Sequence, residues 1–353
     1  MTITPARNGL RTEYAMRYAT DDDLPQILDL LRSNLSNEGV TSKTRAFWAW
    51  KHCNAPAGPS PVLVATAPDE KVIGLRAAMR FDVIELSGKV IHALRPVDTA
   101  THDAWQRKGI FSNLTLELIR DLRGTPVQLL FNTPNNNSLP AYLKLGWQVV
   151  QTVSICITAG SLRKILSNYK PTGTYPDADR VMRDGTRVSI RRFNDIDREE
   201  RESLLAICED YEAARPRSGL RTVRNRVTLS WRYSHPTAEY RILRIYRSAD
   251  SIPIGIVVFR IESRKGLRGA LLIDLFKCPE TGITSILTIA RRAIGVAFYA
   301  YAISEGSSEY DALSRGLSLT VRQVNLAQRG VDVEDKIFDN NHWDISLADI
   351  EMF

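Results

Sequence analysis

Two segments between Gln106 and Trp147 decide the fold. The first reads Gln106-Arg107-Lys108-Gly109-Ile110-Phe111, and the second reads Asn135-Asn136-Asn137-Ser138-Leu139-Pro140-Ala141-Tyr142-Leu143-Lys144-Leu145-Gly146-Trp147. Apolar residues recur at helical spacing after Gly109, and the run VQLLFN between the segments has the composition of a buried strand. We therefore expect a strand that ends near Asp98, a polar loop, a helix that starts beside Gly109, and then another strand.

The start of this helix is suited to binding a phosphate group. The first turn of a helix has free backbone N–H groups and the positive end of the dipole. Gln106, Arg107 and Lys108 add donors and positive charge, and Gly109 lets the backbone approach a ligand closely. An ordinary strand-to-helix loop with a solvated basic turn has the same local sequence, so both readings stay open at this point.

Both segments resemble motifs of the GNAT superfamily of acyl-CoA-dependent N-acyltransferases. Residues 106–111 resemble the pyrophosphate loop Q/R-x-x-G-x-G/A, with Phe111 in place of the final Gly or Ala. Residues 135–147 resemble N-x-x-S/A-x-x-x-Y-x-K-x-G-F/W with every fixed position filled. The resemblance covers residues 15–158. It implies an acyl-CoA site formed by Val97, Thr99, Gln106, Arg107, Lys108, Gly109, Ile110, Phe111, Asn135 and Ser138.

The resemblance also implies direct transfer of the acyl group to an amine. Tyr142 would protonate the departing thiolate, and backbone N–H groups near Val97 would polarise the thioester carbonyl. The residue that takes the proton from the amine is not fixed: Asp98, His102 and the terminal carboxylate of Phe353 are the candidates. Each side chain also has a structural reading. Tyr142 could be a core aromatic, Asn135 a turn former, Asp98 a turn cap and His102 a solvated loop residue.

The second half of the chain repeats the order of the first. VSIRRFNDIDREERESLLAICEDY again gives a strand, an acidic cap and an amphipathic helix. Trp231 to His235 matches Trp48 to His52 in residue type and spacing, and Ile254-Gly255 matches Ile73-Gly74. This ordered similarity predicts a duplicated domain, although two unrelated α/β domains would share some of it.

The predicted fold is therefore α/β (α+β) with two GNAT-like domains. Each is a mixed, mostly antiparallel twisted sheet flanked by helices. Residues 1–160 would be the catalytic domain with the acyl-CoA site, residues 161–185 a linker, and residues 186–353 a degenerate domain that shapes the acceptor cleft. The second half has no counterpart of either motif, and Glu280 stands where basic residues would help to bind a phosphate, so we expect no CoA there.

Composition and charge limit the other classes of function. The net charge of +7 suits a nucleotide-like cofactor or nucleic acid, but no aromatic-interleaved basic repeat accompanies it, so nucleic acid is not the expected partner. The four cysteines are scattered without metal-ligand spacing, so no metal is expected. No signal-peptide core or membrane-length apolar run occurs, which predicts a cytoplasmic protein without a membrane span.

The acidic ending of the chain allows two readings. Asp344, Asp349 and Glu351 either attract a cationic acceptor amine or form a solvated tail. The predicted function is N-acyl transfer from acetyl-CoA, or another acyl-CoA, to a primary amine of a small molecule such as an amino sugar or natural-product intermediate. An aminoacyl-tRNA-dependent transferase with paired GNAT-like domains and a non-catalytic acyl-CoA-binding module are the alternatives. The oligomeric state is left open.

Overall fold

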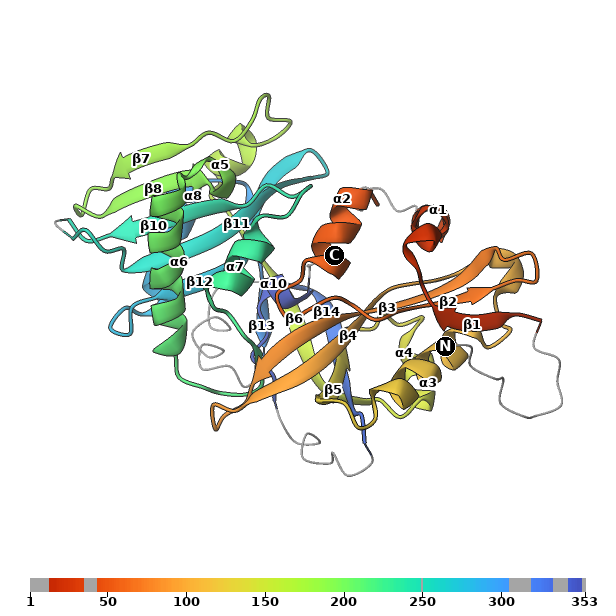
Figure 1. Ribbon diagram of the computed structural model, residues 1–353. Coiled ribbons are helices and arrows are strands. Elements are labelled where there is room, and N and C mark those ends of the chain that lie inside the picture. Colours follow the sequence, from red (N-terminus) through yellow and green to blue (C-terminus); the bar gives the residue numbers. More distant parts are fainter. Residues whose placement is uncertain (1–12, 35–42, 249, 305–318, 333–341, 351–353) are drawn as a thin grey trace. The chain divides into compact units, whose positions relative to one another are not determined.

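The computed structural model describes residues 13–34, 43–248, 250–304, 319–332 and 342–350 (Figure 1). These residues fall into two compact units. Of the described residues, the first unit contains 13–34, 43–82, 91–148 and 327–332, and the second contains 83–90, 149–248, 250–304, 319–326 and 342–350. Within the ranges described, no helix combines the length and the apolar composition needed to cross a bilayer.

The first unit is built on a twisted sheet. Its elements are β1 (Ala15–Tyr18), α1 (Leu24–Asn34), α2 (Arg45–Trp48) continued by a π-helical turn (Ala49–Cys53), β2 (Val62–Thr66), β3 (Val72–Ile84), β4 (Val90–Thr101), α3 (Ile110–Leu122), β5 (Val127–Asn132) and α4 (Leu139–Lys144). The strand order is β1-β2-β3-β4-β5. The β1–β2 and β2–β3 pairs are antiparallel, whereas β4 and β5 run parallel.

The parallel pair β4–β5 diverges after a short contact. His92, Ala93 and Leu94 pair with the first part of β5, and β4 then continues to Thr101 without β5 beside it. The other edge of β5 pairs with residues Ala327–Gly330 from near the end of the chain. The divergence leaves backbone groups of β4 available beyond Leu94, which is the part of the strand that leads to Asp98.

Helix α3 packs its apolar face onto this sheet. Ile110, Leu114 and Leu118 lie four residues apart, so they share one face of the helix and are buried with Leu94 and Leu130. Gly74 of β3 makes the close approach possible. A Cβ atom at Gly74 would lie 2.4 Å from Cγ2 of Ile110.

The second unit contains more helices and strands than the first. They are β6 (Gln148–Ala159), α5 (Leu162–Ser167), β7 (Ala178–Val181), β8 (Arg187–Arg192), α6 (Arg198–Ala213), β9 (Arg221–Thr222), α7 (Arg226–Tyr233), β10 (Arg241–Tyr246), β11 (Gly255–Arg264), β12 (Leu267–Lys277), α8 (Ile283–Ile294), β13 (Phe298–Ser304), β14 (Leu319–Gly330, whose end belongs to the first unit) and α10 (Leu347–Ile350). The strand order β6-β13-β12-β11-β10-β8-β7 contains one parallel pair, β12–β13.

The two units share a local arrangement that the sequence comparison anticipates. In each, a helix connects a pair of parallel strands: α3 connects β4 to β5, and α8 connects β12 to β13. Gly255, like Gly74, lets a helix approach the sheet closely, because a Cβ atom there would lie 2.3 Å from Cδ1 of Ile286 in α8. The predicted fold class, a mixed and mostly antiparallel α/β structure with flanking helices, is confirmed.

The units do not follow the predicted boundaries residue by residue. Residues 149–160, expected at the end of the first domain, pack in the second unit, whereas the described residues 327–332 pack in the first. The expected linker at 161–185 contains α5 and β7, and β7 pairs with β8. Strand pairing between distant segments decides these assignments, and local sequence patterns do not report it.

Candidate active site

The loop–helix junction, residues 106–112, has the geometry of an anion site. Gly109 precedes α3 with φ 78°, and Arg107 also has a positive φ of 62°, which is uncommon for a residue with a side chain. The first helical hydrogen bond runs from Asn113 N–H to the carbonyl of Gly109, over 2.9 Å. The N–H groups from Ile110 to Ser112 therefore have no partner inside the helix.

The side chains of this junction are placed around that free turn. Gln106 Nε2 donates to Asp103 Oδ1 over 2.9 Å. Lys108 forms an exposed ion pair with Glu13 and lies over the Trp105 ring, with Nζ 4.5 Å from the centroid. Arg107 is exposed. The three predicted polar contributors are thus at the start of α3, and their contact with a cofactor stays a prediction.

Tyr142 in α4 is buried and its hydroxyl oxygen accepts two hydrogen bonds. Arg76 Nη1 donates over 3.0 Å and Asn132 Nδ2 over 2.7 Å. Asn132 Oδ1 accepts from Thr133 N–H over 2.8 Å, which fixes the orientation of the amide. Both lone pairs of the phenol are therefore in use, and no described residue accepts its proton. A phenol held in this way is prepared to donate that proton to a ligand.

Asn135 forms a turn at the start of α4. Its Oδ1 accepts from the N–H groups of Asn137 (3.1 Å) and Ser138 (2.9 Å) and from the Ser138 hydroxyl (3.1 Å). This is the turn-forming reading that the sequence left open. The hydrogen bonds between Asn135 and Ser138 therefore fix the start of α4, the helix that carries Tyr142. Contact of Asn135 and Ser138 with the cofactor stays a prediction.

Asp98 lies in a buried group of charges, the Asp98 cluster (Lys43, Lys51, His52 and Asp98). The carboxylate is 2.8 Å from Lys43 Nζ, 2.5 Å from Lys51 Nζ and 3.0 Å from His52 Nε2. Burial alone would raise the pKa of Asp98, but Lys51, His52 and Lys43 outweigh it and hold the pKa well below the usual range. Such a carboxylate accepts a proton poorly, which weighs against Asp98 as the base.

Lys51 is a titratable group that the sequence analysis did not single out. Its side chain is fully buried, and burial lowers its pKa to about 8 although Asp98 opposes the shift. Burial also lowers the pKa of His52. A sequence signal was the position of Lys51 and His52 directly after three aromatic residues, in a stretch whose aromatic side chains are buried.

The two other candidate bases have different outcomes. His102 is half-buried, and its Nδ1 accepts from Ala104 N–H over 3.3 Å, so it caps the short turn Asp103–Trp105. Phe353 lies outside the described residues. Val97 and Thr99 flank Asp98, which has a positive φ of 41°, and this irregular backbone lies on the part of β4 beyond its pairing with β5.

We expect Asp98→Asn to destabilise the fold rather than act on chemistry alone. The change leaves Lys43 and Lys51 buried without their carboxylate, which costs about 3–5 kcal/mol of unfolding free energy. Denaturant unfolding measures it, with Asp82→Asn, an exposed partner of His92, as the matched control. An Asp98→Asn protein with unchanged stability and no turnover would instead make Asp98 part of the chemistry.

The corresponding opening in the second unit is filled by the end of the chain. β12 and β13 pair at Gly269–Leu271 and then diverge. Trp343 bonds Gln151 of β6 through its N–H and carbonyl groups, and Ser304 at the end of β13 donates to that carbonyl. Ser346 Oγ donates to Asp274 of β12 over 3.0 Å. Residues 343–346 therefore contact both diverging strands.

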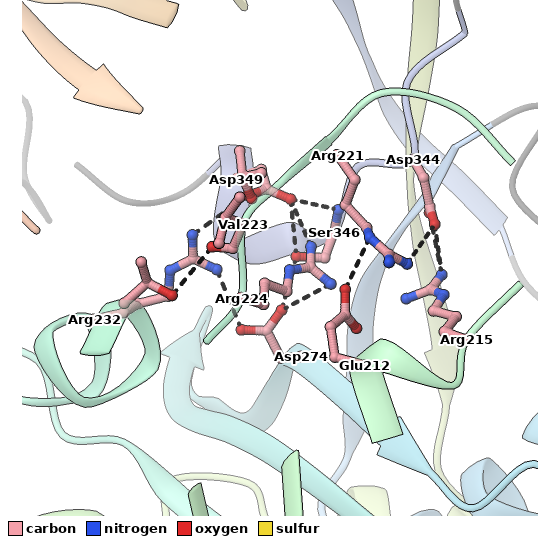
Figure 2. Close-up of polar contacts among 12 residues, drawn as sticks. Glu212, Arg215, Arg221, Val223, Arg224, Arg232, Asp274, Asp344, Ser346 and Asp349 are labelled. Carbon is pink, nitrogen blue, oxygen red and sulfur yellow. Dashed lines mark hydrogen bonds and ion pairs between the residues drawn. The ribbon is translucent and has the colours of Figure 1, made fainter. Parts of the chain in front are cut away.

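A buried ion network, the C-terminal cluster, holds this segment (Figure 2). It pairs arginines with carboxylates and consists of Glu212, Arg215, Arg221, Arg224, Arg232, Asp274, Asp344 and Asp349. Asp349 is 2.8 Å from Arg224 and 3.4 Å from Arg232, and accepts from Thr222 Oγ1 over 2.7 Å. Burial alone would raise the pKa of Asp349, but the two arginines hold it well below its usual range.

This network corrects both readings of the acidic ending. Asp344 and Asp349 are neither a solvated tail nor free to attract an amine, because both are buried and paired with arginines. Glu351 lies outside the described residues. The same pairs engage Arg215, Arg221 and Arg224. Among the residues that the structure describes, no group of three or more His, Cys, Asp or Glu side chains could hold a metal ion.

Comparison with known proteins identifies the family. Residues 15–150 match the model of the acetyltransferase (GNAT) domain. This part of the chain is a GNAT domain. The matched residues include the loop–helix junction, the Asp98 cluster and Tyr142, so the predicted family is confirmed. Comparison with curated protein sequences gives no match.

Several solved structures have a similar fold, and each aligns with nearly the whole chain. A conserved protein of Enterococcus faecalis V583, described as a probable N-acyltransferase, has 14% identity and a TM-score of 0.64, covering 93% of this chain and 75% of its own. A GCN5-related N-acetyltransferase of Anabaena variabilis has 11% identity and a TM-score of 0.64 (91% and 74%). The N-myristoyltransferase of Saccharomyces cerevisiae, solved with myristoyl-CoA, has 11% identity and a TM-score of 0.55 (92% and 85%). At these identities the likeness concerns the fold.

Proposed function

We propose that this chain is an acyl-CoA-dependent N-acyltransferase, with acetyl-CoA as the first donor to test. The observation that carries the proposal is the phenol of Tyr142, buried and bonded by two donors so that its own proton has no acceptor among the described residues. The free N–H groups at the start of α3 support it, because they suit a diphosphate. The GNAT domain fits both features.

The proposed reaction is direct transfer. The thioester brings an acyl group that an amine can attack, so no covalent link to the protein is needed. The Val97 region of β4 donates backbone N–H to the developing oxyanion, and residues 106–111 hold the diphosphate. When the C–S bond breaks and its electron pair goes to sulfur, Tyr142 donates its proton to that sulfur. The amine gives its own proton to a base, for which Lys51 now joins the predicted candidates.

We also propose that the chain is a tandem arrangement in which the second unit binds no CoA. Its diverging strands are contacted by the chain's own residues 343–346, and Glu280 lies just before α8 in place of basic residues. The small-molecule amine acceptor, such as an amino sugar, and the cytoplasmic location remain predictions. The intact loop–helix junction favours acyl-CoA over the aminoacyl-tRNA alternative, which has no use for a diphosphate site.

Calorimetric titration with acetyl-CoA tests the proposal. We expect saturable binding, and we expect Arg107→Glu to weaken it by about tenfold or more, which is about 1.4 kcal/mol, because the change puts a negative charge beside the diphosphate. Arg123→Glu is the matched control, since Arg123 is also exposed but lies at the other end of α3. Absence of acetyl-CoA binding to the unaltered protein would overturn the proposal.

A further inference from the structure

Arg76 of β3 is fully buried and has no carboxylate partner among the described residues. Its Nη1 gives one proton to Thr99 Oγ1 over 2.9 Å and the other to the Tyr142 oxygen over 3.0 Å. Its Nε and Nη2 have no acceptor in the described part of the chain. A buried charge without a counter-ion costs several kcal/mol, so it requires a reason.

The buried arginines of the second unit show what ordinary compensation looks like. Arg224 pairs with Asp349, Arg232 pairs with the same carboxylate, and Arg241 pairs with Asp177 and Glu239. Arg76 has aromatic rings instead of carboxylates. Its guanidinium carbon lies 4.8 Å from the centroid of Phe111 and 5.2 Å from that of Tyr142.

These contacts give a role to the one departure from the family motif. Phe111 stands where the motif has Gly or Ala, and its ring meets the Tyr142 ring edge-on with centroids 5.5 Å apart. A guanidinium over an aromatic face is stabilised by the ring quadrupole without being neutralised. Phe111 thus packs on the buried guanidinium without offsetting its field, whereas a carboxylate partner would offset the field of Arg76 at the phenol.

We propose that Arg76, held by Phe111, is a positioning residue that acts through Tyr142. This inference rests on the proposed acyl transfer. Arg76 and Asn132 occupy the lone pairs of the phenol oxygen and so direct its proton away from the protein. When that proton passes to the leaving thiolate, the negative charge remains on the phenol oxygen, 3.0 Å from the Arg76 guanidinium nitrogen. The phenolate regains a proton from solvent after the thiol leaves.

A double-mutant cycle on acyl transfer tests this role. We expect Arg76→Gln to lower kcat by about 100-fold, the loss typical of one donor to a developing oxyanion, with little change in KM for acetyl-CoA. In a Tyr142→Phe background the same change should cost less than about twofold, because its target oxygen is gone. Arg76→Lys keeps the charge and one donor, and it should recover about tenfold of the loss.

The controls separate chemistry from folding. Arg80→Gln, also in β3 but bonded to the carbonyl of Pro59, should leave kcat unchanged. If Arg76→Gln does not fold, Phe111→Leu removes the aromatic face while keeping Arg76, and its effect on kcat should likewise vanish in the Tyr142→Phe background. Losses that multiply in the double variants, or a change in melting temperature alone, would overturn the role of Arg76. An unaltered protein without acyl-CoA turnover would overturn the proposed function itself.

Discussion

Replacing Tyr142 by Phe is expected to lower kcat for acyl transfer by about 100- to 10,000-fold, the range for loss of a positioned general acid. Phe keeps the ring between Phe111 and Trp147, whose centroids lie 5.5 Å and 5.1 Å from that of Tyr142. The change removes a buried phenol proton that has no acceptor among the described residues. Release of free CoA thiol measures the rate, and calorimetry should show acetyl-CoA affinity within about threefold of the unaltered protein.

The same substitution carries a stability cost that must be separated from the kinetic one. Without the hydroxyl, Arg76 and Asn132 each lose an acceptor in a buried site, at about 1–3 kcal/mol in total. A thermal melt therefore accompanies each rate. Tyr18→Phe is the control, because that phenol is exposed on β1 and bonds Asp121. Turnover that survives in Tyr142→Phe would remove this residue from the mechanism.

The sequence predicts the parts of this site that are local. Gly109 with its positive φ, the free first turn of α3 and the burial of Tyr142 in α4 all follow from motifs within a few residues. Arg76 could not be found in that way, because it reaches Tyr142 of α4 from β3, 66 residues earlier in the chain. Asn132 lies outside both motifs, at the end of β5. The sequence nevertheless contains a signal. Arg76 is a charged residue in the middle of an apolar run, and a buried charged residue needs a partner or a function.

For the fold, too, the sequence indicates features within one short segment but not the pairing of distant segments. The match of Ile73-Gly74 to Ile254-Gly255 was only a sign of repetition in the sequence, and the structure shows that each glycine admits a helix. The placement of β6 and of residues 327–330 depends on which strand edges are open, so no local pattern reports it. The prediction for the acidic ending was wrong for a related reason. The arginines that pair with Asp344 and Asp349 lie more than 100 residues earlier in the sequence, so no local pattern indicates that these carboxylates are buried.

Asp349→Asn is expected to destabilise the second unit strongly. The substitution leaves Arg224 and Arg232 buried beside a neutral amide, and removing one partner from a buried pair costs about 3–5 kcal/mol. Guanidinium unfolding followed by far-ultraviolet circular dichroism measures the change. Asp179→Asn is the matched control in the same unit. Its carboxylate pairs with Arg191 but is 66% exposed, so its loss should cost less than about 1 kcal/mol.

The free energy that the Asp349 carboxylate contributes to stability is expected to decrease at acidic pH. Because the folded pKa of Asp349 lies below its unfolded value, the carboxylate contributes its stabilisation fully above the unfolded pKa, about 4. That contribution decreases as the pH falls below this value towards the folded pKa. The unfolding free energies of the unaltered protein and Asp349→Asn should therefore differ most near pH 7 and converge on acidification. A constant difference from pH 7 to pH 3 would mean that Asp349 stabilises the segment through packing and hydrogen bonds rather than through its charge.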